Sequence, residues 1–301
     1  MLYVFRPTAA KKEVQTMSAI KIGGNGGRTV IGIDVGGSTT KIVGFTSDGT
    51  LVSPMLVKAN DPVTSAYGAF GKFTLENRIP LDQIDRVMMT GVGSAFITEP
   101  VFSLPCVPVS EFDSIGIGGL YLSGLSEAIV VSMGTGTALI HAKESEGKVT
   151  CDYLGGTGVG GGTINGLSRK MLDIGSVSHL EQLCEGGDLS RVDLRISDIS
   201  RPGIFPNVNT DLTASNFGGL SDLANRHDIA LGIFNMVSET VAMISIFAAR
   251  NFGLCDIVLT GNLTTIKPIR AVFHSLEPVF GVRFLIPDLS QYGTVIGAAL
   301  Q

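Results

Sequence analysis

The 301-residue sequence predicts an α/β fold of two similar halves around a central cleft. A three-strand meander that opens with a glycine- and hydroxyl-rich hairpin occurs near residue 30 and again near residue 128, which indicates an internal repeat. Helices and further strands alternate after each meander, as in α/β folds. The composition, 44% hydrophobic and 16% charged, is typical of a well-buried globular chain that is long enough for two lobes.

The elements of the first half are predicted from apolar runs that end at glycine, proline or polar residues. These runs indicate strands at 30–35, 40–46 and 51–57, a helix near 63–77, a strand at 84–89 and a strand leading into 107–109. A helix follows from Ser110, because Ser110 with Asp113 three residues later resembles a capping box.

The second half repeats this order and adds helices. Strands are predicted at 128–133, 138–142 and 148–154, before a glycine-rich turn, helices and a long helix at about 228–251. A strand at 257–259, a helix at 266–276, a strand at 282–286 and a helix at 291–300 complete the chain. The sequence therefore divides into a flexible leader (1–28), an N-terminal lobe (29–125) and a C-terminal lobe (126–301).

The first hairpin, residues 34–41 (DVGGSTTK), is the most informative segment. Its two glycines permit a tight turn and the close approach of a ligand, and hydroxyl, ammonium and N–H groups surround its tip. Asp34 ends the first strand, where a carboxylate can hold a hydrated metal ion. The same residues also suit an ordinary β-hairpin. A second hairpin of this type at 133–137 (MGTGT) favours phosphate binding over that structural alternative.

A glycine cluster at 155–163 (GGTGVGGGT) leads into a predicted helix start. Successive backbone N–H groups at such a start can bind an anion. Residues 156–161 also match G-x-G-x-x-G, but a dinucleotide-binding fingerprint belongs early in a βαβ unit and this one follows a meander. The sequence contains no GxxxxGK[ST], so it is not a P-loop NTPase, and no GxSxG, which disfavours an esterase.

Two more segments are candidates for the site. Glu111 lies in the first turn of the helix that follows strand 107–109, where it is either a general base beside the cleft or a carboxylate stabilised by the helix dipole alone. The strand at 257–259 ends in Thr260, Gly261 and Asn262, which could approach a nucleoside.

The composition disfavours several classes of protein. A net charge of −5 without a block of Lys or Arg argues against nucleic acid or an anionic membrane as the main partner. The four cysteines are widely separated and form no CxxC, so reduced thiols in a cytoplasmic protein are expected rather than a zinc or iron–sulfur site. Residues 230–249 are apolar but contain Asn235, Ser238 and Glu239, which predicts a buried helix rather than a membrane span. The leader lacks a long apolar region, so no secretory signal is predicted.

With these motifs in this order, residues 30–300 resemble the type II pantothenate kinases of the actin/hexokinase/Hsp70-like ATPase superfamily. The resemblance implies two ribonuclease-H-like (actin-like ATPase) lobes of duplicated βββαβαβα type, with ATP and Mg²⁺ as cofactors. It implies phosphorylation of pantothenate to 4′-phosphopantothenate, the first step of coenzyme A biosynthesis. It also implies a homodimer, for which the helix at 230–250 is a candidate interface unless it belongs to the core.

The resemblance also assigns roles to residues. Glu111 would be the catalytic base, and Asp34 would hold Mg²⁺ directly or through water. The nucleotide-binding residues would be Asp34, Val35, Gly36, Gly37, Ser38, Thr39, Thr40, Lys41, Thr135, Gly161, Gly162, Thr163, Ile164, Asn165 and Asn262. Residues 211–218 (DLTASNFG) also resemble a family segment, without an assigned role.

Two positions depart from the family pattern. An arginine that helps to hold pantothenate is expected just before the glycine-rich loop, where this chain has residues 151–153 (CDY) and where Arg169 is a candidate substitute. Ala138 stands where a hydroxyl is expected. A kinase of this fold that acts on another small hydroxyl acceptor is therefore an alternative.

A second alternative is a nucleotide-dependent activator or regulatory protein. Residues 34–41 also resemble the start of the activator ATPases of 2-hydroxyacyl-CoA dehydratases. Those proteins need cysteines for a cluster at a dimer interface, and the cysteine spacing here gives no such pair within one subunit.

Overall fold

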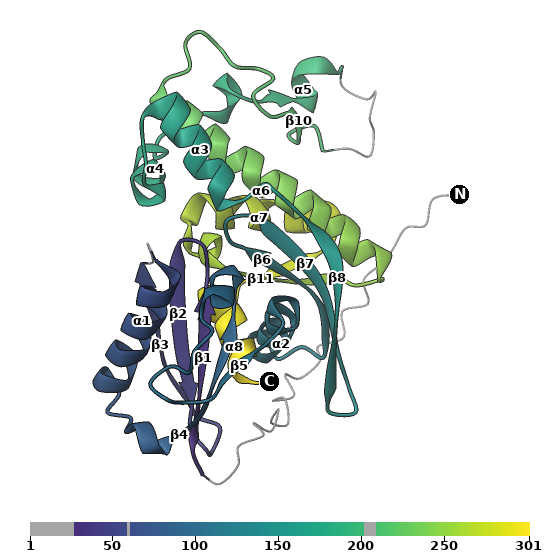
Figure 1. The fold of residues 1–301 in the computed structure, drawn as a ribbon. Helices are drawn as coiled ribbons and strands as arrows, with labels where there is room; N and C mark the ends of the chain where they lie inside the picture. The colour runs from purple at the N-terminus through teal and green to yellow at the C-terminus, as the bar shows by residue number, and fades with distance from the viewer. Residues whose placement is uncertain (1–26, 59–60, 202–208) are drawn as a thin grey trace.

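The computed structural model describes residues 27–58, 61–201 and 209–301. The predicted leader lies outside the described residues except for its last two positions. The chain forms two five-stranded mixed sheets, one from each half of the sequence, with helices on their faces (Figure 1).

The N-terminal sheet has the strand order β3-β2-β1-β4-β5. Its first three strands form the predicted antiparallel meander, and β4 and β5 extend the sheet in parallel from β1. The elements are β1 (Thr29–Val35), β2 (Thr39–Phe45), β3 (Leu51–Lys58), α1 (Pro62–Glu76), the 3₁₀ helix η1 (Leu81–Gln83), β4 (Ile84–Thr90), the 3₁₀ helix η2 (Val92–Phe96), β5 (Cys106–Pro108) and α2 (Glu111–Ser123).

The C-terminal sheet has the order β12-β11-β6-β7-β8. Its meander is again antiparallel, and β11 and β12 are parallel to β6. The elements are β6 (Glu127–Met133), β7 (Thr137–Ser145), β8 (Lys148–Thr157), α3 (Gly161–Leu172), α4 (Val177–Leu183), η3 (Leu189–Arg191), β9 (Leu194–Arg195), α5 (Ile196–Ile199), β10 (Thr213–Ser215), α6 (Arg226–Asn251), β11 (Asp256–Thr260), η4 (Asn262–Thr265), α7 (Lys267–Phe280), β12 (Arg283–Leu285), η5 (Ser290–Tyr292) and α8 (Gly293–Ala299).

The two sheets repeat one another strand for strand. Read from β8, the second order β8-β7-β6-β11-β12 reproduces the first order β3-β2-β1-β4-β5, including the change from antiparallel to parallel pairing. The predicted repeat is therefore confirmed. The carboxyl ends of β1 and β4 in one sheet are equivalent to those of β6 and β11 in the other.

The helix starts near the first sheet follow from local capping chemistry. The Asp61 side chain accepts a hydrogen bond of 2.6 Å from the Thr64 amide at the start of α1, and Pro62 takes the first helical position. Ser110 caps α2, as the sequence predicts, and accepts a hydrogen bond of 3.2 Å from the Asp113 amide. These caps place the first turn of α2 directly after β5.

The last helix of each half packs on the sheet of the other half (Figure 1). Ile115 and Leu120 of α2 pack with Val130 and other residues of the C-terminal sheet. Val295 and Ile296 of α8 pack with residues of β2. The two helices therefore join the lobes, and the domain division at residue 125 stays a prediction.

Glycines bring α2 and α8 unusually close together. A Cβ atom on Gly118 of α2 would lie 2.7 Å from the carbonyl carbon of Gly293. A Cβ atom on Gly297 of α8 would lie 2.6 Å from the Gly118 amide nitrogen. Real Cβ atoms do not approach other atoms this closely, so the crossing requires glycine on both helices.

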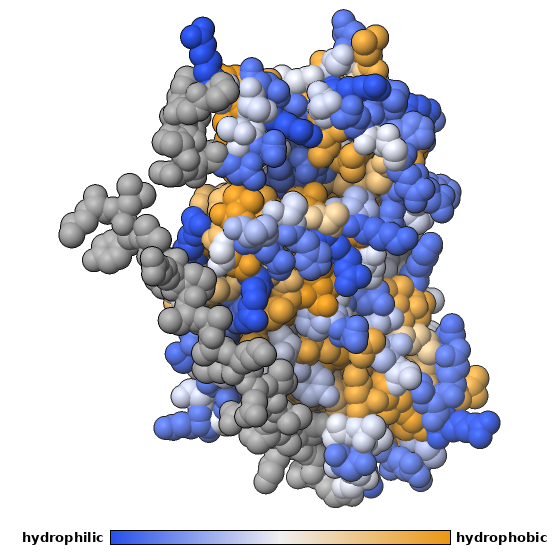
Figure 2. Space-filling view, turned by 180° about the vertical axis from the view of Figure 1, so that it is seen from behind, coloured by the Kyte–Doolittle hydropathy of each residue, from blue (hydrophilic) through white to orange (hydrophobic). Residues whose placement is uncertain are grey.

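The long helix α6 is mainly a core element, as the sequence predicts. By length and composition it is the one helix among the described residues that could cross a membrane, yet 61% of its most apolar window is buried inside the protein. On its outer side Phe247 and Ile244 are 57% and 36% exposed. The rear face of the molecule carries apolar residues in patches among hydrophilic ones (Figure 2).

The segment that resembles the family at 211–218 packs against α6. Glu239 of α6 accepts hydrogen bonds from the Thr213 hydroxyl at 2.8 Å and from the Asn216 amide group at 2.7 Å. Asp193 accepts hydrogen bonds from the Phe217 amide and from Asn235 of α6. In this structure the segment therefore serves to attach the β9–β10 region to α6.

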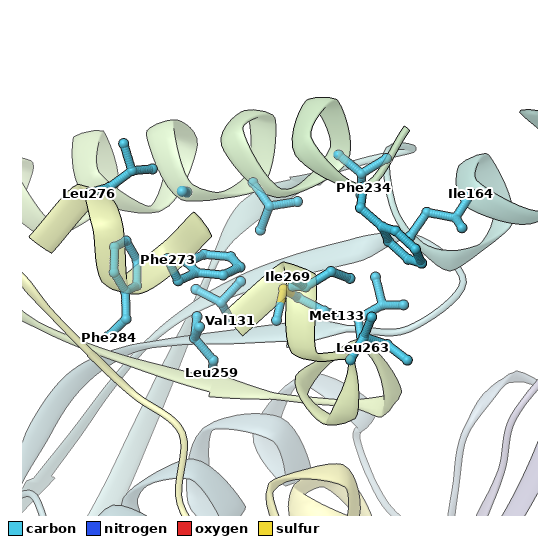
Figure 3. Close-up of a cluster of buried hydrophobic side chains, with 14 of the residues drawn as sticks. Val131, Met133, Ile164, Phe234, Leu259, Leu263, Ile269, Phe273, Leu276 and Phe284 are labelled. Carbon is cyan, nitrogen blue, oxygen red and sulfur yellow. The ribbon is translucent and has the colours of Figure 1, made fainter. Parts of the chain in front are cut away.

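The largest core lies between the C-terminal sheet and the helices α6 and α7 (Figure 3). Val131 and Met133 of β6 point toward this core beside Phe273 of α7, and Phe234 of α6 lies beside Ile164 of α3. This packing fixes the end of β6 and the start of α3, which are the two elements that carry the second hairpin and the glycine cluster.

Candidate active site

The first hairpin turns tightly at the end of β1. The Gly36 amide donates a hydrogen bond of 3.0 Å to the Thr39 carbonyl, which closes the turn. Gly37 and Ser38 are exposed at its tip, and a Cβ atom on Gly37 would meet no atom within 4 Å. The side chain of Val35 points away and belongs to the N-terminal core. The tip and its backbone are thus open to a ligand.

Asp34, Lys41 and Glu111 form a charged group beside this hairpin. Asp34 and Lys41 are paired across β1 and β2, both are buried, and the Lys41 Nζ atom lies 3.9 Å from the Asp34 Oδ2 atom. Glu111 comes from the first turn of α2 and interacts electrostatically with both. The sequence suggested that Lys41 lies at the hairpin tip. In the structure it does not, because the strand register places it opposite Asp34.

Burial perturbs all three groups. Loss of hydration raises the pKa of Asp34, against the opposing charge of Lys41. Loss of hydration also lowers the pKa of Lys41, against the charges of Asp34 and Glu111. The pKa of Glu111 is raised by burial and by the Asp34 charge, although Lys41 lowers it. A carboxylate with a raised pKa is a better proton acceptor near neutral pH.

A turn after β4, which the sequence analysis missed, supports Asp34 from behind. Gly91 has φ of +86°, and a Cβ atom there would lie 2.5 Å from Asp34 Oδ1 and 2.6 Å from the Val35 carbonyl oxygen. Thr90 pairs with Asp34 in the β1–β4 register, and its buried hydroxyl has no hydrogen-bond partner. The signal was available, because Thr90-Gly91 recurs at the equivalent place in the second half as Thr260-Gly261.

The second hairpin and the glycine cluster dock onto one another. The Gly161 amide donates to the Gly134 carbonyl at 2.9 Å, and the Gly162 amide donates to the Thr135 carbonyl at 2.8 Å. A Cβ atom on Gly160 would lie 2.8 Å from the Thr135 carbonyl oxygen, so the contact requires glycine there. The cluster therefore forms the end of β8, a turn and the start of α3, rather than one loop.

The residues of α3 that the sequence assigns to nucleotide binding have different surroundings in the structure. The amides of Gly161 and Gly162 are already bonded to the second hairpin, and Ile164 is fully buried in the core with its amide bonded to the Gly160 carbonyl. The Thr163 hydroxyl accepts a hydrogen bond from the Gly160 amide and donates one to the Gly158 carbonyl. Asn165 is partly exposed in the same first turns of α3. These residues therefore mainly hold in place the turn at Gly158 and the second hairpin at Thr135.

Asn262 connects the two lobes at the first hairpin. Its side-chain amide nitrogen lies 3.4 Å from the Thr39 hydroxyl as a donor, and its Oδ1 atom is buried without a partner. Gly261 before it has φ of +92° and packs on the Met133 backbone at the end of β6. The strand end predicted to approach a nucleoside therefore lies between the two hairpins.

Tyr153 and Ala138, the two departures from the family pattern, lie close together. Tyr153 of β8 stacks on Phe112 of α2, with ring centroids 4.1 Å apart and planes at 13°. A Cβ atom on Gly156 would lie 3.2 Å from the Tyr153 hydroxyl and 3.5 Å from the Ala138 Cα atom. Arg169 is exposed, with its guanidinium beside Gly175.

These residues fit a nucleoside triphosphate with a magnesium ion. Cβ atoms on Gly37 and Gly158 would meet nothing within 4 Å, so both turns have room for phosphate oxygens. Lys41 forms an ion pair with Asp34 at 3.9 Å but is too far away for a hydrogen bond, so the Asp34 oxygens can also bind a cation. The described residues contain no cluster of three His, Cys, Asp or Glu side chains that could hold a metal ion. Mg²⁺ is commonly held by one or two carboxylates together with water and phosphates. Asp34 can provide such a carboxylate.

Comparison with known proteins identifies related sequences. The sequence model of the Fumble family matches residues 126–276. A type II pantothenate kinase of Oceanobacillus iheyensis is 31% identical over 201 residues, which cover 64% of this chain and 73% of that protein. A type II pantothenate kinase of Staphylococcus aureus is 29% identical over 242 residues, which cover 77% of this chain and 84% of that protein.

Solved structures confirm the fold. The activator of the 2-hydroxyisocaproyl-CoA dehydratase from Clostridium difficile, with bound ADPNP, is similar with a TM-score of 0.64. It is 17% identical, and the match covers 90% of this chain and 93% of that one. The predicted actin/hexokinase-like ATPase fold is therefore confirmed, and the fold is one that holds an ATP analogue in that relative.

Proposed function

The chain belongs to the Fumble family of type II pantothenate kinases, and on this basis we propose that it transfers the γ-phosphoryl group of ATP to pantothenate. The product would be 4′-phosphopantothenate, in the first step of coenzyme A biosynthesis. The observation that carries the proposal is the convergence of Asp34, Lys41 and Glu111 beside the first hairpin.

The two hairpins would hold the phosphates from opposite lobes. Gly37 and Ser38 are exposed at the tip of the first hairpin, Thr135 is exposed at the tip of the second, and Gly158 is exposed in the adjacent turn before α3. Asn262 would lie between them, where its free Oδ1 atom can accept a hydrogen bond from the nucleotide. Phosphoryl transfer needs mainly positioning and electrostatic stabilisation, and backbone amides with hydroxyls provide both.

Glu111 would act as the general base. As the pantothenate hydroxyl oxygen bonds to the γ-phosphorus, the bond from that phosphorus to the ADP oxygen breaks and the hydroxyl proton passes to Glu111. Its raised pKa suits it to accept this proton. Lys41, which acts electrostatically on both Asp34 and Glu111, would offset part of the repulsion between the two carboxylates and of their repulsion of the incoming phosphates.

Asp34 would hold Mg²⁺, directly or through a bound water. The ion neutralises phosphate charge during transfer when it is bound. The turn at Gly91 keeps the Asp34 carboxylate in place, because nothing larger than glycine fits behind it.

The oligomeric state and location are part of the proposal. A cytoplasmic homodimer is supported by the family and by the exposed Phe247 and Ile244 on α6. Sedimentation velocity of the wild type and Phe247→Ala tests the interface, and a wild-type monomer would contradict it.

The function is tested by product analysis with several acceptors. We expect ATP, Mg²⁺ and pantothenate to give ADP and a phosphorylated product in equal amounts, with the product mass of 4′-phosphopantothenate. Pantetheine, hydroxy acids and sugars serve as competing acceptors in the same assay. Brisk phosphorylation of one of these, without pantothenate turnover, would contradict the proposed substrate while leaving the kinase fold intact.

A further inference from the structure

We propose that Phe112 and Tyr153 form an aromatic wall of the acceptor site and that Tyr153 determines how tightly pantothenate is bound. The inference rests on the proposed kinase function and extends it to the acceptor side of the cleft. It concerns binding of the acceptor, not the transfer of the phosphoryl group.

The two rings form an apolar surface that is open on one side. Their centroids are 4.1 Å apart with nearly parallel planes, and they come from α2 and β8. Although they are in contact, Phe112 remains 41% exposed and Tyr153 51% exposed. Stacked aromatic rings that remain this exposed offer area to a ligand that is not used by the core.

The position of the pair relates it to the reacting hydroxyl. Phe112 directly follows Glu111 in the first turn of α2. At the other end, the Tyr153 hydroxyl lies beside Gly156, which pairs with Ala138 just after the second hairpin. The rings therefore join the turn of α2 that carries the proposed base to the part of β8 beside the second hairpin, and we place the acceptor along them.

The chemistry of pantothenate matches an apolar wall at this place. Its reactive primary hydroxyl is attached to a carbon next to a quaternary carbon that carries two methyl groups. When that hydroxyl points at Glu111, the methyl groups lie within reach of the adjacent rings. Burial of methyl groups against aromatic carbon is favourable through the hydrophobic effect.

The two elements that carry the rings contain few basic residues. Helix α2 contains no Lys or Arg, and the only basic residue of β8 is Lys148 at its opposite end. Asp113 and Asp152 both act electrostatically on Cys151, the neighbour of this surface. The wall thus provides apolar contact, while Lys41 of β2 acts electrostatically on the neighbouring Glu111 and His141 Nδ1 lies 3.7 Å from Asp152 Oδ2.

Kinetics of three variants test the proposal. We expect Tyr153→Ala to raise the KM for pantothenate about tenfold, because it removes most of the apolar wall area, while kcat and the KM for ATP change less than about threefold. Tyr153→Phe keeps the ring and should stay close to the wild type. Tyr67→Ala is the matched control, since it disrupts a different aromatic pair, Tyr67 of α1 with Phe102, and should leave all three constants unchanged.

Two results would contradict the proposed role of Phe112 and Tyr153. One is an unchanged KM for pantothenate in Tyr153→Ala, and the other is an equal rise in the KM for ATP, which indicates general distortion of the cleft. Thermal unfolding of each variant shows whether it is folded at the assay temperature. A wild type that turns over no pantothenate would instead refute the proposed function, so the two failures are distinguishable.

Discussion

At the scale of residues, the candidate site depends on three ionisable side chains that lie together in a partly buried environment. Asp34 and Lys41 face one another because their strands are paired, and Glu111 joins them because Ser110 starts α2 at that point. Burial disfavours the charged form of each group, while their mutual attraction and repulsion redistribute the effect. The result is a carboxylate, Glu111, that is adapted to accept a proton.

The raised pKa of Glu111 predicts the pH dependence of the reaction. As the proposed base, Glu111 would accept a proton only in its ionised form, so kcat/KM should rise with pH through a pKa above the ordinary 4.5 of glutamate. A rate profile from pH 4 to pH 9, with saturating ATP, measures this acid limb. A rate that is flat from about pH 4.5 upward would contradict the assignment.

The same shift has a consequence for stability. Between 4.5 and the raised pKa of Glu111, the folded protein retains a proton that the unfolded chain has released. The contribution of Glu111 to the unfolding free energy therefore falls as pH rises through this window. Urea unfolding of Glu111→Gln, which cannot ionise, should show a weaker fall across the same window than the wild type.

Gly91 gives a sharper test of how Asp34 is positioned. Gly91→Ala places a Cβ atom 2.5 Å from Asp34 Oδ1 at φ of +86°, so we expect kcat/KM to fall at least about tenfold as the carboxylate moves. Gly49→Ala is the matched control, with φ of +85° and no atom within 4 Å of its Cβ position. Both should lose about 1–2 kcal/mol of stability from backbone strain. Gly91→Ala should lose about 1–3 kcal/mol more from overlap with the Val35 backbone, and only Gly91→Ala should lose activity. Equal activities would contradict the role of the turn.

Sequence reasoning at this scale identified candidate residues but not all of their places in the structure. It selected Asp34 and Glu111, although either could also be a purely structural carboxylate, and the structure brings both beside the first hairpin. The burial of Lys41 was not, since it depends on hairpin register. Ile164 was assigned to the nucleotide, yet its side chain is in the core, because the helix start supplies backbone groups rather than side chains.

At the scale of elements, glycines determine how closely helices and turns approach. Gly160 allows the start of α3 to dock on the second hairpin, and the crossing of α2 with α8 relies on Gly118, Gly293 and Gly297. The sequence revealed the glycine cluster, but its division among β8, a turn and α3 could not be predicted. The strand continues to Thr157 because it pairs with β7 up to that residue.

The helix crossing predicts a large effect of one methyl group. Gly297→Ala inserts a Cβ atom 2.6 Å from the Gly118 amide nitrogen, so we expect overpacking to lower the unfolding free energy by about 1–3 kcal/mol. Gly68→Ala in α1 is the control, because its Cβ atom would meet nothing within 4 Å and should raise stability by about 0.5–1 kcal/mol. Urea unfolding midpoints measure both. Similar midpoints for the two variants would show that the crossing is not tight.

At the scale of the whole molecule, the chain is a repeat whose two copies have exchanged their last helices. The repeat itself was predictable from the two meanders, because apolar runs and hairpin residues recur in order. The exchange was not predictable, since the apolar face of α2 or α8 does not specify which sheet it will cover. That exchange places Glu111, which follows the first sheet, at the junction of both lobes.

We propose that this junction is the catalytic site of an ATP-dependent pantothenate kinase, with Glu111 as its base. The most direct test is pantothenate-dependent ATP turnover by the wild type and Glu111→Gln, with Asp113→Asn as control for an acidic residue of the same helix turn. We expect a loss of at least about 100-fold in kcat for Glu111→Gln alone, with ATP binding retained in a thermal-shift assay. A Glu111→Gln variant that keeps the wild-type rate would contradict it.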